Sequence, residues 1–109
     1  MRGTEEQVGW AQRIKPYKIG EAITYIIAAE VRHGKMSPQA IRARNGFKIF
    51  ADEKSAAWWI EWRDVDIALV MSDAVERAVR DAGSEEALAN KYKLERPNGQ
   101  TLRLHSAAP

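Results

Sequence analysis

The chain has 109 residues, a net charge of +2 and no cysteine. This length suits a single globular domain, and the absence of cysteine excludes disulfides, thiolate metal sites, iron–sulfur clusters and thiol nucleophiles. With 45% apolar residues and four tryptophans, the chain has enough hydrophobic material to fold. We expect an N-terminal arm over 1–18, one globular domain over 19–105 and a frayed tail over 106–109.

The apolar segments are short. No uninterrupted apolar run is longer than that from Ile67 to Met71, whereas a membrane-spanning helix needs about 20 apolar residues. The N-terminal sequence MRGTEEQVGW is polar and acidic where a signal peptide has an apolar stretch. The sequence therefore predicts a cytoplasmic protein without a membrane partner.

Residues 1–18 contain two glycines and a proline and lack sustained periodicity, so we expect an arm whose Trp10 and Tyr17 dock on the body. A helix over about 19–33, ending at Gly34, is predicted next. Its apolar residues recur at helical spacing: Ile19, Ala22, Ile23, Ile26, Ile27 and Val31.

Ser37 followed by proline is typical of a helix start, because the hydroxyl accepts a free backbone amide and proline needs no donor there. This pattern predicts a short helix over 38–44. The pair Asn45-Gly46 is expected to end it. The aromatic and β-branched residues at 47–50 then predict a short strand.

Asp52 is the expected N-cap of the next helical segment, which has no glycine or proline until Gly83. One bent helix and two helices are both compatible with this pattern. The apolar run at 65–71 suits a strand or a helix, and we favour helix up to 82 because of a continuous 3.6-residue period. That period comprises Val65, Leu69, Ser72, Val75, Val79 and Ala82.

Ser84 and the two glutamates after it predict a further helix ending near Tyr92. The segment Arg96-Pro97-Asn98-Gly99-Gln100 suits a hairpin turn between strands 92–96 and 100–104. The inward face of this hairpin would carry Tyr92, Leu94, Leu102 and Leu104.

The expected fold class is α+β and mainly α. It comprises a small domain of about four to five helices, a short strand near 47–50 and the C-terminal hairpin, with a winged-helix-like arrangement as one form.

Catalytic motifs are scarce. The two histidines, His33 and His105, lie outside any metal-binding spacing, and the chain has no glycine-rich phosphate loop. Acidic pairs such as Asp64 and Asp66 are more typical of helix caps than of magnesium sites. We therefore expect a non-enzymatic protein with no metal and no cofactor.

Charge is unevenly distributed along the chain. Residues 32–48 contain five Lys or Arg and no acid, whereas residues 52–86 contain ten acids and four bases. If two helices meet at residues 34–36, the second would present side chains suited to phosphates and base edges, as in a helix-turn-helix. The expected DNA contacts are Arg32, Lys35, Gln39, Arg42, Arg44 and Lys48, with Lys93, Arg96 and Arg103 as secondary phosphate contacts.

A second stretch, AVRDAGSEEALANKYKL over 78–94, resembles the opening of Cro-type helix-turn-helix repressor domains, in which a helix ends at Ala-Gly-Ser before a short Ala-Leu-Ala helix. The likeness covers 17 of 109 residues. It implies a helix-turn-helix-like local shape. The family's recognition helix would fall on ERPNGQTLRL, which has the pattern of a hairpin instead, and Glu85 and Glu86 would repel phosphate.

A tryptophan cluster supports a different function. Trp58 and Trp62 share one helical face, while Trp59 points about 100° away beside Arg63, so at least one ring is expected at the surface. Tryptophan is common in interface hot spots, and the surrounding acids suit a basic partner. The same rings also suit an ordinary buried core.

The leading hypothesis is a small regulatory DNA-binding protein, and the alternative is a protein-binding adaptor or inhibitor that acts through Trp58, Trp59, Trp62 and Arg63. For a repressor-like domain a homodimer is expected, because DNA half-sites are usually bound by two-fold pairs.

Overall fold

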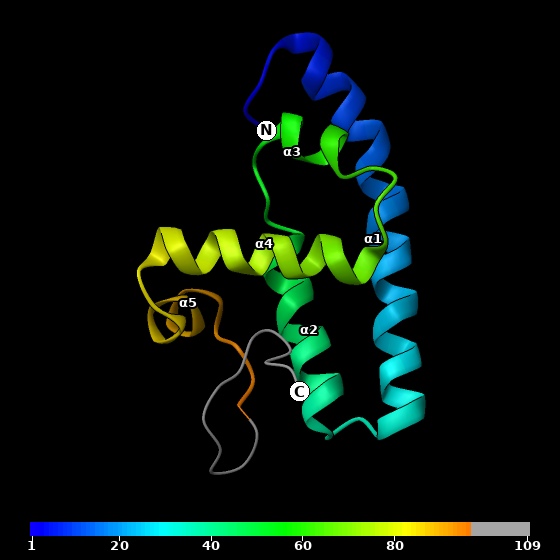
Figure 1. Ribbon diagram of the computed structural model, residues 1–109, viewed down its shortest axis with the longest axis vertical. Helices are drawn as coiled ribbons and strands as arrows, with labels where there is room; N and C mark the ends of the chain where they lie inside the picture. Colours follow the sequence, from blue (N-terminus) through cyan, green and yellow to red (C-terminus); the bar gives the residue numbers. More distant parts are fainter. Residues whose placement is uncertain (97–109) are drawn as a thin grey trace.

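A computed structural model of the protein describes residues 1–96 (Figure 1). Within this range the chain forms five helices and no strand; one isolated β-bridge joins Arg2 and Ser55. The fold of the described region is therefore small and mainly helical. None of its helices is both long enough and apolar enough to cross a membrane. The helices are α1 (Glu5–His33), α2 (Pro38–Phe50), α3 (Ala56–Glu61), α4 (Ile67–Ala82) and α5 (Glu85–Tyr92).

Helix α1 begins far earlier than the sequence predicts, so most of the expected arm over 1–18 is helical. The start is a capping box: the Thr4 hydroxyl accepts the Gln7 amide at 3.2 Å, and the Gln7 side chain accepts the Thr4 amide at 3.0 Å. Val8 and Ala11 pack in the core, and this packing outweighs the helix-weakening glycine and proline residues nearby. Trp10 and Tyr17 are exposed on the helix instead of docking as parts of an arm.

The connection between α1 and α2 matches the prediction. Gly34 ends α1 with a φ of 95°, a backbone conformation that side chains disfavour. Ser37 caps α2 by accepting the Ala40 amide at 3.1 Å, and Pro38 occupies the first turn. The two helices then run side by side in opposite directions, as a helical hairpin (Figure 1).

The predicted strand at 47–50 is wrong, because α2 continues through Asn45 and Gly46 to Phe50. Asn45 is fully buried, and its amide donates to the Glu95 carbonyl at 2.8 Å and accepts the Glu95 amide at 2.9 Å. Gly46 is buried against α4, and a Cβ there would lie 3.5 Å from the Met71 methyl, an ordinary packing distance. Local propensity predicts that α2 ends at these two residues, but their tertiary contacts keep them inside the helix.

The segment from 52 to 82 forms two helices, and its predicted N-cap is misplaced. Ser55 caps α3 and Asp66 caps α4, whereas Asp52 accepts a hydrogen bond from the Tyr92 hydroxyl at 2.6 Å. The buried face of α4 is also rotated from the predicted one, because Leu69 is 60% exposed. The buried residues of α4 are Ile67, Val70, Met71, Ala74 and Val75.

The end of α4 and the start of α5 agree with the sequence: Gly83 adopts the left-handed conformation, and Ser84 accepts the Ala87 amide. The first hairpin strand at 92–96 is absent, because Tyr92 belongs to α5 and Lys93 caps that helix with a φ of 52°. The predicted turn, the second strand at 100–104 and the tail at 106–109 lie outside the described residues.

Aromatic rings form the centre of the core. Phe50 lies 5.0 Å from Trp59 and 6.2 Å from Trp58 between ring centroids. Both indole nitrogens are satisfied, by the Asp73 carboxylate for Trp58 and by the Glu53 carbonyl for Trp59. A second apolar cluster joins α2, α4 and α5 and contains Ile49, Val75, Leu88, Ala89 and Leu94.

We predict that Trp59→Ala lowers the free energy of unfolding by about 3–5 kcal/mol, because it removes a ring that is 1% exposed from the centre of the core. Urea unfolding followed by circular dichroism measures this loss. Trp10→Ala is the matched control, since Trp10 is 42% exposed, and it should cost much less. Equal losses in the two variants would contradict this account of the core.

Candidate binding groove

A groove of about 900 Å³ lies where the second half of α1, the middle of α2 and the start of α4 meet. Most side chains along it are apolar. The α1 wall contains Thr24, Tyr25, Ile27, Ala28, Ala29, Val31, Arg32 and His33. The α2 wall contains Gln39, Arg42, Ala43 and Gly46, and the α4 wall Ala68, Leu69, Met71, Ser72 and Val75.

Large apolar side chains on the rim of the groove remain in contact with solvent. Val31 is 82% exposed, Leu69 is 60% exposed and Ile27 is 53% exposed. Single exposed apolar residues are ordinary, but a group of them around one concavity is typical of an interaction site.

The charged groups of the groove are all basic. Arg32, His33 and Arg42 line it, and no Asp or Glu belongs to the lining within the described residues. The Nε of Arg42 is buried and donates to no acceptor in residues 1–96. Arg42 has no carboxylate partner in this region, and a carboxylate is the strongest acceptor that a protein ligand could offer to its guanidinium.

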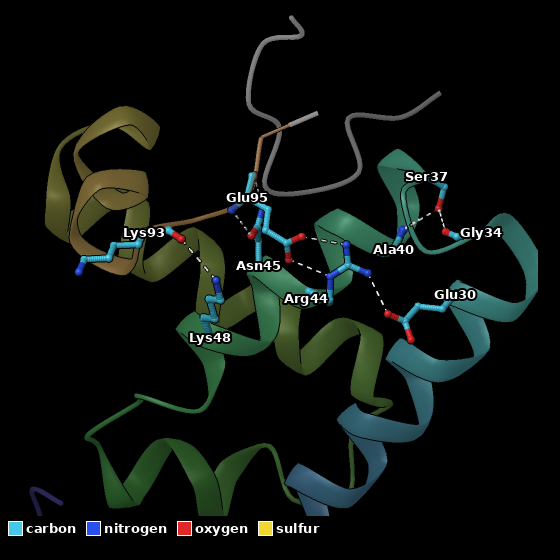
Figure 2. A network of polar contacts seen from close by, with 9 residues as sticks. All are labelled: Glu30, Gly34, Ser37, Ala40, Arg44, Asn45, Lys48, Lys93 and Glu95. Atoms are coloured by element: carbon cyan, nitrogen blue, oxygen red, sulfur yellow. Dashed lines mark hydrogen bonds and ion pairs between the residues drawn. The ribbon is translucent and has the colours of Figure 1, made fainter. Parts of the chain in front are cut away.

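Arg44 lies on the side of α2 opposite to Arg42, because side chains two positions apart on a helix point about 200° away from each other. Figure 2 shows its guanidinium held between two carboxylates. Nε and Nη2 donate to Glu95 at 2.8 and 2.9 Å, and Nη1 donates to Glu30 at 2.8 Å. These bonds raise the pKa of Arg44 and hold the pKa of Glu95 below its usual range. Arg44 thus anchors the chain after α5 and is committed to internal ion pairs.

Like Arg44, other predicted DNA contacts lie away from the groove. Lys48 donates to the Lys93 carbonyl at 3.3 Å, and Arg96 pairs with Glu86. Arg103 lies outside the described residues. Of the nine residues proposed from the sequence, the structure brings together four at the α1–α2 end of the molecule: Arg32, Lys35, Gln39 and Arg42.

The α1–α2 pair differs from a helix-turn-helix. In that motif the two helices meet at about 90–120°, whereas α1 and α2 lie side by side and point in opposite directions (Figure 1). Gln39 and Arg42 consequently face the groove and not an isolated helix surface.

The predicted tryptophan interface is largely core. Trp58 is 3% exposed and Trp59 is 1% exposed, so neither ring reaches a partner. Trp62 is partly buried and stacks on Trp58, with 6.2 Å between ring centroids. Arg63 is at the surface, where its guanidinium lies 5.0 Å from the centroid of the exposed Trp10 ring.

The apolar wall of the groove was missed by the sequence pattern. The helical spacing of the apolar residues in 19–33 predicts the helix, but three of these residues, Ile23, Ile27 and Val31, are exposed. At 100° per residue these side chains span a sector wider than the contact with one neighbouring helix covers. The width of this apolar sector was the signal in the sequence that could have indicated an exposed apolar surface.

Comparison of this chain with protein-family models, with curated proteins and with solved structures finds no match. The chemistry of the groove therefore carries the functional argument.

We predict that Arg44→Gln lowers the free energy of unfolding by about 1–2 kcal/mol at pH 7, a modest amount because the Glu95 side chain is 37% exposed. Glu95 has a lowered pKa in the folded state, so the unfolded chain takes up its proton first and the stabilisation is lost as pH falls. The two proteins should differ fully above about pH 5, and the difference should shrink as pH falls below the usual glutamate range.

Urea midpoints measured from pH 3 to pH 7 test this dependence. Arg80→Gln is the control, because Arg80 is exposed and no ion pair involves it within the described residues. A difference between Arg44→Gln and the parent that stays constant with pH would contradict the role assigned to the ion pair.

Proposed function

We propose that the protein is a protein-binding module whose groove accepts an amphipathic helix carrying acidic residues. The observation that carries the proposal is the combination of an apolar concavity, an entirely basic set of charged lining groups and a buried Arg42 Nε without an acceptor in residues 1–96. Helix-in-groove binding uses these features, with apolar anchors in the groove and charge pairs along its edge.

The form of the groove supports a helix over a small molecule. Small-molecule sites enclose about 70–90% of their ligand. Here Val31 and Leu69 are more than half exposed on facing rims, so an occupant would keep one side in solvent. A helix about 10–12 Å across satisfies this arrangement, because it buries one apolar stripe and leaves its polar side hydrated.

The basic groups set the charge of the partner. A glutamate or aspartate beside the apolar stripe would pair with the guanidinium of Arg42, a partly exposed side chain that lines the groove. Arg32, in the last turn of α1, would extend the attraction toward the end of the groove. A basic helix would meet like charge there, so the groove discriminates by repulsion as well as by attraction.

We predict that a synthetic helical peptide of about 18 residues, with leucines at i, i+3, i+4 and i+7 and flanking glutamates, binds this groove. Methyl-labelled methionine gives a direct readout by NMR, since the chain has three methionines. Met71 lines the groove, whereas Met1 lies in the N-terminal segment outside it. The Met71 signal should shift on titration and the Met1 signal should not.

Two comparisons give this titration its specificity. Arg42→Gln should weaken binding by about tenfold through loss of a charge-assisted contact, whereas Arg80→Gln, on the exposed side of α4, should not. An isomeric peptide with lysines in place of the glutamates should bind poorly. Equal affinity for the two peptides, or an unchanged Met71 signal, would refute the proposal.

A second candidate function is DNA binding, and one observation favours it. Arg32, Lys35 and Gln39 are exposed together at the α1–α2 end of the molecule, within a segment that has no acid between residues 31 and 47. The Cro-type likeness over 78–94 adds to this candidate only through local shape, because residues 97–104 of the position where the recognition helix would lie are outside the described residues.

If this end contacts phosphates, binding to mixed-sequence duplex DNA should weaken by about tenfold or more between about 50 and 200 mM salt. Fluorescence anisotropy measures the affinity. The double variant Arg32→Gln with Lys35→Gln should abolish binding, while Arg80→Gln with Lys91→Gln, equal in charge change, should retain most of it. Absence of binding at both salt concentrations would remove DNA as a partner.

A further inference from the structure

The outer face of α1 is exposed and uncharged over half of its length. In Figure 1, α1 runs along one edge of the molecule, with α2, α3 and α4 all to one side. On the side away from these helices, Tyr17 is 78% exposed and Ile23 is 45% exposed. Toward the end of α1 the same stripe continues into Ile27 and Val31, exposed residues that also line the groove. At 100° per residue this face comprises Pro16, Tyr17, Gly20, Ile23, Thr24, Ile27 and Val31.

The polar side-chain groups of this face are two hydroxyls. The Thr24 hydroxyl already donates to the Gly20 carbonyl at 3.1 Å, and the Tyr17 hydroxyl stands at the tip of a side chain that is 78% exposed, where it can keep its contact with water. The cost of removing water from the face is therefore low, while about 25 cal/mol is gained for each Å² of apolar surface covered.

Two glycines within α1 have no role inside the described chain. A Cβ at Gly9 or Gly20 would meet no atom within 4 Å, and neither residue has a positive φ. A glycine in the interior of a helix costs about 1 kcal/mol relative to alanine. Their use becomes clear if another surface approaches α1 closely at these two positions.

The charges at the ends of α1 indicate what that surface is. The first turn is acidic, with Glu5 and Glu6, and the last turn is basic, with Arg32 and His33. A parallel second copy would bring like charges together at both ends. An antiparallel copy opposes the two helix dipoles and brings the acidic first turn of each helix beside the basic α1–α2 connection of the other, where Lys35 is exposed, so α1 is complementary to itself in this orientation.

We propose that two copies of this chain associate through the outer faces of α1, antiparallel, with Gly20 on the two-fold axis. This register places residue i opposite residue 40−i, so Gly20 faces Gly20 and Tyr17 faces Ile23. It also seats Val31, the most exposed of these side chains, against the open Gly9. Arg13 then lies over Ile27, where its aliphatic stem packs and its guanidinium reaches solvent.

One helix pair is a small interface, so the affinity should be on the order of micromolar. Sedimentation velocity over about 1–300 µM should show the chain changing from monomer to dimer. Ile23→Glu should raise the dissociation constant by about tenfold or more, because it buries a carboxylate opposite Tyr17. Circular dichroism verifies that this variant folds, as expected for an exposed position.

Ile23 does not line the groove, so this test is independent of the proposed function. Leu69→Glu, a change in the groove, is the matched control and should leave the dimer unchanged. A parent protein that stays monomeric at the highest concentration, or a dimer that is indifferent to Ile23→Glu, overturns the proposal.

Disulfide trapping tests the register, because the chain has no cysteine of its own. Gly20→Cys should crosslink to itself on mild oxidation, and Tyr17→Cys should crosslink to Ile23→Cys in a mixture. Tyr17→Cys alone should not crosslink, since the two sites would be displaced by about 9 Å along the helix axes. Efficient crosslinking of Tyr17→Cys to itself would indicate a parallel pair and overturn the antiparallel arrangement.

Discussion

Phe50, Trp58 and Trp59 meet where the end of α2, the short α3 and the first half of α1 converge, and the cluster around them holds α1, α2, α3 and α4 together. Because both indole nitrogens have fixed acceptors, the rings are held in orientation as well as in position. This cluster uses one side of α1 completely. The rest of that helix is left for the groove and for the outer face, so the core itself creates the surfaces considered above.

The two sides of α2 have different tasks. On one side, the Asn45 side chain forms two hydrogen bonds with the Glu95 backbone, and Arg44 forms an ion pair with the Glu95 carboxylate (Figure 2). On the other side, Arg42 meets no carboxylate in residues 1–96. Arg42 and Arg44 thus have different roles although they are two positions apart in one basic segment: Arg44 pairs with internal carboxylates, whereas Arg42 lines the groove. The direction of each side chain on the helix determines this difference.

Local signals in the sequence identify several helix ends but not the buried faces. Gly34, Ser37 and Ser84 were placed correctly, because capping depends on a few neighbouring residues. Asn45-Gly46 misled, because distant contacts with Glu95 and Met71 hold the helix there. The basic segment at 32–48 can be identified from the sequence, because charge is read directly from residue types. The apolar groove beside it cannot, because periodicity gives the spacing of an apolar face but not which neighbour covers that face.

Groove and outer face depend on separable residues, although Ile27 and Val31 border both. Arg42 and Leu69 belong to the groove, where charge selects the occupant. Gly20 and Ile23 belong to the outer face, whose middle is uncharged, so selection there comes from close approach and from the charges at the two ends of α1. Under the two proposals, the surface of α1 that the core leaves uncovered serves two partners of different chemistry, and neither surface needs an electrostatic feature of the other to discriminate.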